Sequence, residues 1–127
     1  MKTIKKTILV LMLLGLYASA NADVVQVWKC TLHDGKTPDD VMKASSAWLA
    51  AAKSMKGGGE LKVYHEFPLA ANPGPSGFNF VMIAPDAESW GVFTGGYESS
   101  AAAKADEAWG EAAQCSGSSL WNSTRVN

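Results

Sequence analysis

The sequence lacks the residue patterns by which common catalytic and cofactor sites are recognised. Its two cysteines form no C-x-x-C pair and no C-x-x-C-H haem-attachment sequence, and its two histidines form no H-E-x-x-H zinc motif. The glycine run at residues 57–59 follows an expected helix instead of opening one, and no Gly-Lys-Ser/Thr sequence completes a phosphate-binding loop. We therefore expect no metal site and no bound cofactor, and no signature in the chain names a function.

Long hydrophobic runs are also missing. The apolar run Ile8–Leu16 is too short to span a bilayer. It follows a lysine-rich start and leads to Ala20-Asn21-Ala22, which has the A-x-A form that signal peptidases accept. We predict a bacterial signal peptide over residues 1–22 and a single mature domain over residues 23–127, located in the periplasm or secreted. No stable membrane insertion is expected after cleavage.

An excess of positive charge is absent as well. The chain has 11 Lys and Arg against 12 Asp and Glu, for a formal net charge of −1. Loss of the leader lysines makes the predicted mature domain more acidic still. Because nucleic acids and anionic membranes are bound through basic patches, both are poor candidate partners.

The two cysteines, Cys30 and Cys115, both lie in the predicted mature domain. In an oxidising compartment, two cysteines in a small domain usually pair. The chain-entropy model puts the stabilisation from closing so long a loop at up to roughly 4.5 kcal/mol. The alternative is a pair of reactive thiols, but no histidine adjoins either cysteine. We predict a structural disulfide.

Two segments near the start of the mature domain have clear patterns. Residues 24–30 have apolar side chains on both faces, with Gln26 the polar exception, which is typical of an interior strand. Thr37 suits a helix N-cap and Pro38 suits the first helical position. An apolar stripe at helical spacing follows, formed by Val41, Ala44, Trp48, Ala52 and Met55. The glycine run ends this helix.

The later segments complete the pattern. Residues 60–67 alternate as a strand should, and residues 78–83 form a second apolar strand, so a long loop joins an antiparallel pair. A helix is expected from Pro85 to about Phe93. A second helix, capped by Ser99 or Ser100, is expected to reach about Ala113, with a final strand over residues 115–126.

The resulting order of elements is β-α-β-β-α-β, with the second helix broken. This order is that of a ferredoxin-like α+β sandwich, a four-stranded antiparallel sheet with helices on one face. In such a fold the first and last strands lie side by side and antiparallel, so the end of one meets the start of the other. Cys30 and Cys115 occupy those two places.

The two-layer pattern, the length and the two-sided apolar strands resemble the dimeric α/β-barrel superfamily, in which two ferredoxin-like subunits pack sheet to sheet. The resemblance covers most of residues 23–127, and no motif matches residue by residue. It implies a homodimer. Because the superfamily includes cofactor-independent monooxygenases, haem-degrading enzymes and small-molecule isomerases, it also implies that an enzyme of this kind is an alternative.

His65 is the best single candidate for acid–base chemistry, because histidine titrates near neutral pH. Its expected neighbours on the strand are apolar and would lower its pKa. The alternative is a core histidine hydrogen-bonded to backbone. His33 is expected in a solvated loop. His65 and Glu66 point to opposite faces of a strand, so they cannot bind one metal together.

The five tryptophans permit two interpretations. They fill the space between sheet and helices, which the helical spacing favours for Trp48 and Trp109, or they line a pocket for a flat apolar ligand. Trp28 and Trp121 could instead face a partner subunit. Our candidate ligand-binding residues are Trp28, Tyr64 and His65, and Tyr97 is a further candidate hydrogen-bond donor.

Two functions follow from these observations. The first is an exported binding or interaction domain that takes a small apolar or aromatic ligand, supported by the many aromatic side chains and the missing catalytic motifs. The alternative is a cofactor-independent enzyme of the monooxygenase or isomerase type, with His65 near the reacting atom, accompanied by Tyr64 or Trp28.

Overall fold

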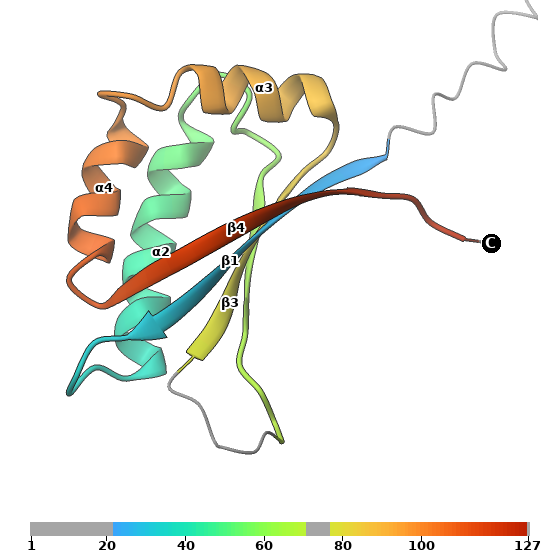
Figure 1. Ribbon diagram of the computed structural model, residues 1–127. Coiled ribbons are helices and arrows are strands. Elements are labelled where there is room, and N and C mark those ends of the chain that lie inside the picture. Colours follow the sequence, from blue (N-terminus) through green and yellow to red (C-terminus); the bar gives the residue numbers. More distant parts are fainter. Residues whose placement is uncertain (1–21, 71–76, 127) are drawn as a thin grey trace, which may run out of the picture.

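The computed structural model describes residues 22–70 and 77–126, and these form a four-stranded antiparallel sheet with helices on one face (Figure 1). The elements are β1 (Asp23–Leu32), α2 (Pro38–Lys53), β2 (Lys62–Glu66), β3 (Gly77–Ala84), α3 (Ala87–Gly95), α4 (Ala101–Trp109) and β4 (Ala113–Ser123). The strand order in the sheet is β2-β3-β1-β4, which is the ferredoxin-like order. The predicted α+β fold class is confirmed.

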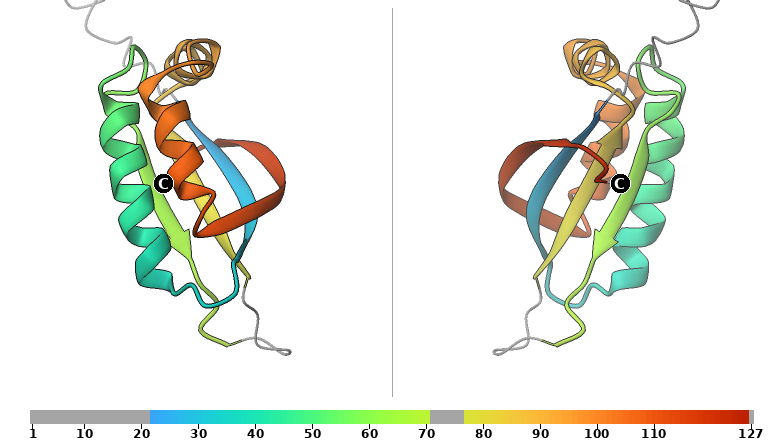
Figure 2. Two further views of the ribbon diagram at one scale, coloured as in Figure 1. Left: turned by 90° about the vertical axis from the view of Figure 1, so that its left-hand side faces the viewer. Right: turned by 90° about the vertical axis from the view of Figure 1, so that its right-hand side faces the viewer.

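Strand β1 lies inside the sheet, as its two-sided apolar pattern predicted. It pairs antiparallel with β3 on one side and with β4 on the other. Cys30 lies opposite Cys115 in the β1–β4 register, and the two form the predicted disulfide. The register between these strands shifts at Lys29/Cys30. Beyond that point β4 is strongly curved, as both views in Figure 2 show, and it stays paired with β1 as far as Ser123.

Helix α2 begins where the capping pattern placed it. The Thr37 backbone N–H donates to Asp40 Oδ2 at 2.8 Å, and the Asp40 backbone N–H donates to Thr37 Oγ1 at 3.3 Å, which completes a capping box. The Thr37 backbone hydrogen bond lowers the pKa of Asp40. Val41, Trp48 and Ala52 are buried. Ser45 is buried as well, although the apolar stripe predicted from the sequence did not include it.

The glycine run connects α2 to β2 and packs against α3. Gly57 has a φ of +81°, and a Cβ there would lie 2.6 Å from the Ser89 carbonyl oxygen. At Gly58 a Cβ would overlap the Ala52 carbonyl oxygen, whereas at Gly59 it would meet nothing within 4 Å. Two of the three glycines are therefore required by close contacts between backbones.

Helix α4 is shorter than the sequence predicted. It ends at Trp109 instead of continuing to about Ala113, and β4 begins at Ala113 instead of residue 115. Gly110 is a poor helix former, and Ala113 is held opposite Leu32 in the β1–β4 ladder. Strand pairing therefore overrides the alanine-rich helical pattern over the last few residues.

The pleat of the sheet divides its residues into a covered face and an open face. The covered face packs against the helices, and from β1 and β3 it presents Val24, Gln26, Trp28, Cys30, Phe78, Phe80, Met82 and Ala84. On the open face the register sets Tyr64 beside Val81 and Val27, and Ile83 beside Val25 and Trp121. Helices α2 and α4 lie side by side over the covered face, and α3 crosses one end (Figures 1 and 2).

The predicted signal peptide, residues 1–22, lies outside the described residues except for Ala22. The division into residues 1–22 and 23–127 therefore stays a prediction. Within residues 22–70 and 77–126, no helix has both the length and the apolar character needed to cross a membrane.

Candidate ligand pocket

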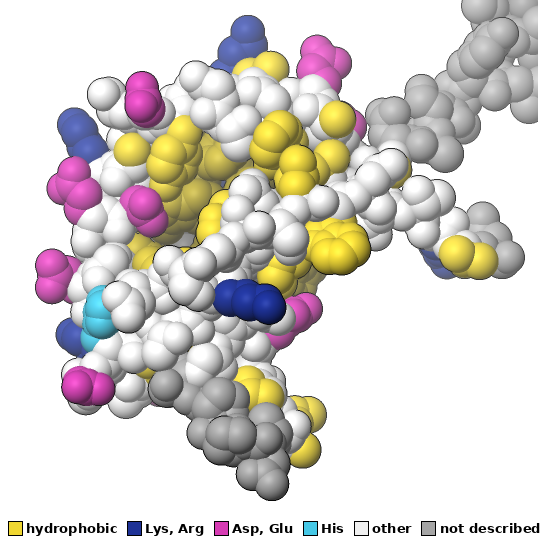
Figure 3. All heavy atoms as spheres, in the orientation of Figure 1, with side chains coloured by type: hydrophobic (Ala, Val, Ile, Leu, Met, Phe, Trp, Pro, Cys, Tyr) yellow, Lys and Arg dark blue, Asp and Glu magenta, His cyan; other side chains and the backbone are white. Residues whose placement is uncertain are grey.

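A cavity of about 710 Å³ lies between the covered face and the helices. In Figure 3 its mouth is an apolar hollow between α3, α4 and β4. Its volume falls within the range of about 300–1,000 Å³ that is usual for small-molecule sites. Six aromatic side chains line it, namely Trp28, Trp48, Phe80, Phe93, Tyr97 and Trp109. Its walls are therefore suited to an apolar, aromatic ligand.

Phe80 organises the aromatic wall. Its ring meets Trp28 and Trp48 with centroids 5.6 Å apart in each pair, and it meets Trp109 at 5.8 Å. All three pairs are edge-to-face, the arrangement that the charge distribution of aromatic rings favours. Because these contacts fix the rings against one another, the wall is formed before any ligand arrives.

Hydrogen bonds hold the polar edges of two pocket tryptophans. Trp48 Nε1 donates to the Tyr97 hydroxyl oxygen at 2.9 Å, and Trp109 Nε1 donates to Ser45 Oγ at 2.7 Å. A buried indole N–H without a partner would be costly. With these groups paired inside the protein, the carbon surfaces of the rings remain to contact a ligand.

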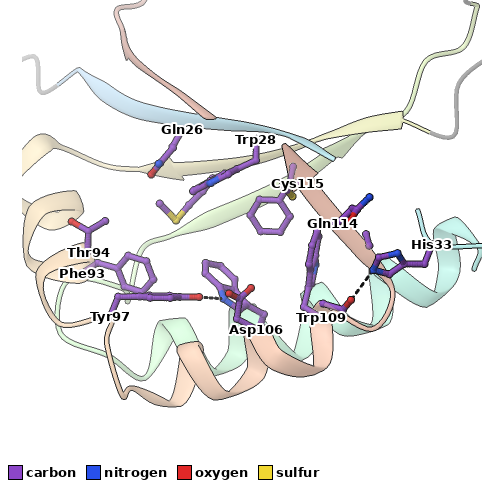
Figure 4. A pocket seen from close by; sticks show the side chains of 15 residues that line it. Gln26, Trp28, His33, Phe93, Thr94, Tyr97, Asp106, Trp109, Gln114 and Cys115 are labelled. Atoms are coloured by element: carbon purple, nitrogen blue, oxygen red, sulfur yellow. Dashed lines mark hydrogen bonds between the residues drawn. The ribbon is translucent and has the colours of Figure 1, made fainter. Parts of the chain in front are cut away.

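Tyr97 and Asp106 form the polar floor of the pocket (Figure 4). The Tyr97 hydroxyl accepts a hydrogen bond from Trp48, so its own hydrogen is available to the Asp106 carboxylate. Burial raises the pKa of Tyr97, and the negative charge of Asp106 raises it further. Burial also raises the pKa of Asp106, and the hydrogen bond from Tyr97 opposes that increase. A carboxylate in this setting can accept a proton from a weakly acidic ligand.

His65 lies behind the pocket wall, on the covered side of β2. Its Nε2 is 2.8 Å from Ser45 Oγ, the same hydroxyl that accepts from Trp109. Burial lowers the pKa of His65, as the sequence led us to expect, and Nδ1 is buried without a hydrogen-bond partner. The ring also packs against Phe78 at 5.3 Å and Phe80 at 5.5 Å. Its partner is a side chain, and not the backbone that the alternative interpretation named.

The three candidate ligand-binding residues do not come together. Trp28 lines the pocket and His65 is one layer behind it. Tyr64 is 53 % exposed on the open face, on the opposite side of the sheet. A ligand in this pocket could contact Trp28 directly, whereas Phe80 and Trp109 of the wall separate it from His65. Direct ligand contact by any of the three stays a prediction.

Several pocket residues were missed by the sequence analysis. Gln26 could have been recognised from the sequence, because it is a polar residue among apolar neighbours in an interior strand. Thr94 and Asp106 could not have been recognised from the sequence, because polar residues such as these are common on the solvent-facing side of a helix. His33, expected in a solvated loop, lies near the mouth, where Nε2 is 2.9 Å from the Gly110 carbonyl oxygen. In the described part of the chain, no three His, Cys, Asp or Glu side chains gather as metal ligands would.

The structure is similar to the crystal structure of SnoaB, a cofactor-independent oxygenase from Streptomyces nogalater. The match has a TM-score of 0.56 and covers 83 % of this chain and 96 % of that chain, with 10 % sequence identity. No protein-family model matches the sequence, and no curated protein matches it significantly. At this identity the likeness concerns the fold alone. It agrees with the predicted ferredoxin-like fold and assigns no residue a role.

Proposed function

We propose that the chain is an exported binding domain that takes a flat, apolar aromatic molecule into the pocket beneath the covered face. The observation that carries this proposal is the aromatic cavity of about 710 Å³. Its wall is held by edge-to-face contacts around Phe80. Because this wall does not need to be ordered on binding, little of the free energy gained by burying a ligand is spent on side-chain entropy.

Binding can be tested with 2-ethylnaphthalene as an apolar probe in equilibrium dialysis. We expect saturable binding of one molecule per chain. Thr94 lines the pocket and is half buried, so Thr94→Trp places an indole in the cavity and should weaken binding at least tenfold. Tyr64→Trp adds the same side chain on the open face and serves as the matched control. The proposal fails if the probe does not saturate, or if Thr94→Trp binds as well as the unaltered protein.

The second candidate function is cofactor-independent oxygenation, and the pairing of Tyr97 with Asp106 at the pocket floor favours it. The structural likeness to SnoaB, itself a cofactor-independent oxygenase, adds support at the level of fold only. Asp106 would take the proton of a ring hydroxyl, and the resulting anion would give one electron to molecular oxygen. The substrate radical and superoxide so formed would combine, which makes a C–O bond to the ring and leaves a peroxide that takes up a proton. His65 would act as a positioning residue, by holding Ser45 and Trp109.

Oxygenase activity can be tested by oxygen uptake with 1,4-dihydroxynaphthalene, corrected for the rate without protein. We expect Asp106→Asn to abolish any protein-dependent uptake, and His65→Ala to reduce it. Asp39→Asn removes an exposed carboxylate from the first turn of α2, away from the pocket, and should leave the rate unchanged. If uptake persists in Asp106→Asn, that carboxylate is not the base. If His65→Ala keeps full activity, the role of His65 is excluded.

We also propose that a second copy of the chain covers the open face. Tyr64 and Trp121 remain 53 % and 60 % exposed there, alongside Val25, Val27 and Ile83. Such a continuous apolar patch often marks an interface. Size-exclusion chromatography with light scattering should give the mass of a dimer. The double variant Tyr64→Ser/Trp121→Ser should be monomeric, whereas Met42→Ser, which alters an equally exposed apolar residue of α2, should not change the mass.

Export can be tested independently. A protein expressed with its full sequence in a Gram-negative host should be recovered from the periplasm with Asp23 as its first residue. The disulfide between Cys30 and Cys115 fits an oxidising destination. Amino-terminal sequencing that returns Met1 from a cytoplasmic fraction would contradict the proposed signal peptide.

A further inference from the structure

We propose that Gln26 supplies the pocket with a hydrogen-bond donor of fixed orientation, and that the natural ligand is a flat aromatic molecule with a carbonyl-type acceptor at that end. The inference rests on the proposed binding function. It adds the chemistry by which the pocket distinguishes one apolar aromatic molecule from another.

The orientation of the Gln26 amide follows from its partner. Trp90 Nε1 donates a hydrogen bond to the Gln26 side chain, with 3.0 Å between the two heavy atoms. An indole N–H is a donor only, so the atom that faces Trp90 must be the carbonyl oxygen Oε1. If the Gln26 amide were rotated by half a turn, its NH₂ group would face the Trp90 indole N–H, and two donors would oppose each other. Trp90 therefore directs the NH₂ group of Gln26 away from itself.

That NH₂ group belongs to the pocket. Gln26 lines the cavity and projects from β1 beside Trp28, at the end that also holds Phe93, Thr94 and Tyr97 (Figure 4). Among residues 22–70 and 77–126, Gln26 Nε2 makes no hydrogen bond to protein. The opposed residue on β3, Met82, has no oxygen or nitrogen in its side chain to offer.

The other hydroxyl groups at this end have their hydrogens engaged elsewhere. Thr94 Oγ1 donates to the Trp90 carbonyl oxygen at 2.8 Å. The Tyr97 hydroxyl accepts from Trp48 and faces Asp106. A ligand acceptor in this region therefore meets the Gln26 amide and no competing donor from Thr94 or Tyr97.

The consequence for selectivity follows from the cost of an unpaired donor. In the empty pocket, water can accept from Gln26 Nε2, and an entering ligand displaces that water. A ligand without an acceptor leaves the amide N–H unpaired in apolar surroundings, whereas a carbonyl oxygen restores the bond. We expect the difference to favour the acceptor-bearing ligand by about tenfold in affinity.

Two probes of nearly equal shape test this. 2-Acetonaphthone carries a ketone where 2-ethylnaphthalene carries a methylene group. Equilibrium dialysis measures the affinity for each probe. The affinity for 2-acetonaphthone divided by that for 2-ethylnaphthalene gives a ratio, which is compared between protein variants. The hydration of the free probes cancels in this comparison because it is the same for every variant. Gln26→Leu should lower the ratio about tenfold while leaving 2-ethylnaphthalene binding intact. Trp90→Phe, which frees the amide to rotate, should lower the ratio by a smaller factor.

Two further variants sharpen the result. Gln26→Glu keeps an acceptor for Trp90 but presents a second oxygen to the pocket, so it should reject the ketone and bind the hydroxyl donor 2-naphthol more tightly. Gln114→Leu removes an amide at the other end of the pocket (Figure 4) and should leave the ratio unchanged. Thermal unfolding of each variant shows whether it is folded, and the Glu and Trp90 variants carry the test if Gln26→Leu does not fold.

The proposal is overturned if the unaltered protein and Gln26→Leu show the same ratio, or if Gln114→Leu changes it as much as Gln26→Leu does. In either case 2-ethylnaphthalene still binds, so the proposed binding function stands. If neither naphthalene probe binds the unaltered protein, the binding function itself has failed, and the role of Gln26 with it.

Discussion

The two faces of the sheet are built from the same strands but differ in what they contain. The covered face adjoins the aromatic pocket, the Tyr97–Asp106 pair at the pocket floor and the Trp109–Ser45–His65 hydrogen bonds. The open face holds Tyr64 and Trp121 together with aliphatic side chains. The Trp121 indole makes a local hydrogen bond there, from Nε1 to Ser119 Oγ at 2.8 Å. We propose small-molecule binding for the covered face and association with a second copy for the open face.

Tyr64 and His65 show how sharply the pleat separates these roles. They are adjacent in the chain, yet one is exposed to solvent and the other lies among Ser45, Phe78 and Phe80. Side chains that alternate along a strand cannot serve one site unless the strand ends or bulges there. Grouping the two as one ligand site therefore conflicts with the strand pattern itself. If the two faces are independent, a change on one face should leave the other intact.

The largest effect is expected from the disulfide, because it joins β1 to β4 and both faces depend on that pairing. Reduction, or the double variant Cys30→Ala/Cys115→Ala, should lower the free energy of unfolding by about 2–5 kcal/mol. Urea unfolding with and without a reducing agent measures this. The double variant should not respond to the reducing agent. A loss below about 1 kcal/mol would mean that the strand pairing holds without the disulfide.

The next largest effect is expected at Ser45. Its hydroxyl serves both Trp109 Nε1 and His65 Nε2, so Ser45→Ala leaves two partly or fully buried nitrogens unpaired and should cost about 2 kcal/mol. Ser46→Ala, one position along the same helix and exposed, is the control and should change stability by less than about 0.5 kcal/mol. Equal effects of the two would show that the hydrogen bonds at Ser45 are not important.

A smaller effect is expected from the titration of His65. Burial lowers its pKa in the folded protein below the usual 6.5. The unfolded chain therefore takes up the proton first, and stability falls as the pH drops from about 6.5 toward the lowered pKa. Because the ring is only half buried, we expect a total loss below about 1 kcal/mol.

Urea unfolding at a series of pH values measures the titration of His65, with His65→Gln as the control that lacks this slope. Asp106 acts in the opposite direction, because its pKa is raised above 3.8. Over that lower pH window the folded protein binds the extra proton, and stability decreases as the pH rises. If the slope near pH 6 is unchanged in His65→Gln, another group causes it.

The smallest effect on the stability of a single subunit is expected from the open face. Tyr64→Ser should change the free energy of unfolding of the monomer by no more than about 0.5 kcal/mol, because the side chain is largely exposed. Unfolding at low protein concentration, where any dimer has dissociated, measures this. A large loss there would show that Tyr64 supports the sheet itself, and the distinction between the two faces would fail.

Local patterns predicted the fold because each depended on near neighbours in sequence. Thr37 caps α2 through Asp40, and the strand around His65 alternates as a half-buried strand must. Pairing Cys30 with Cys115 then selected the topology, because only adjacent end strands bring the two together. The error at the end of α4 has a different origin, since the ladder between Leu32 and Ala113 involves residues far apart in the chain.

The pocket was less predictable, for a physical reason. Its residues come from β1, α2, β3, α3, α4 and β4, and a cavity exists only where side chains from these elements fail to fill the space between them. Trp48 and Trp109 satisfied the pattern of core residues and are indeed buried, yet they also form the wall. Sequence spacing identifies a buried face. It does not tell a filled interior from a hollow one.

The three glycines between α2 and β2 bear on how freely this sequence can vary. In a library of random substitutions selected for folding, position 59 should accept nearly any residue. Positions 57 and 58 should return glycine, because a Cβ at either collides with backbone atoms of Ser89 or Ala52. The glycine run has the composition of a flexible linker, yet two of its three positions should tolerate substitution poorly. The glycine run packs against α3, which carries the pocket residues Phe93 and Thr94. The shape of the pocket therefore depends on Gly57 and Gly58, which have no side chains.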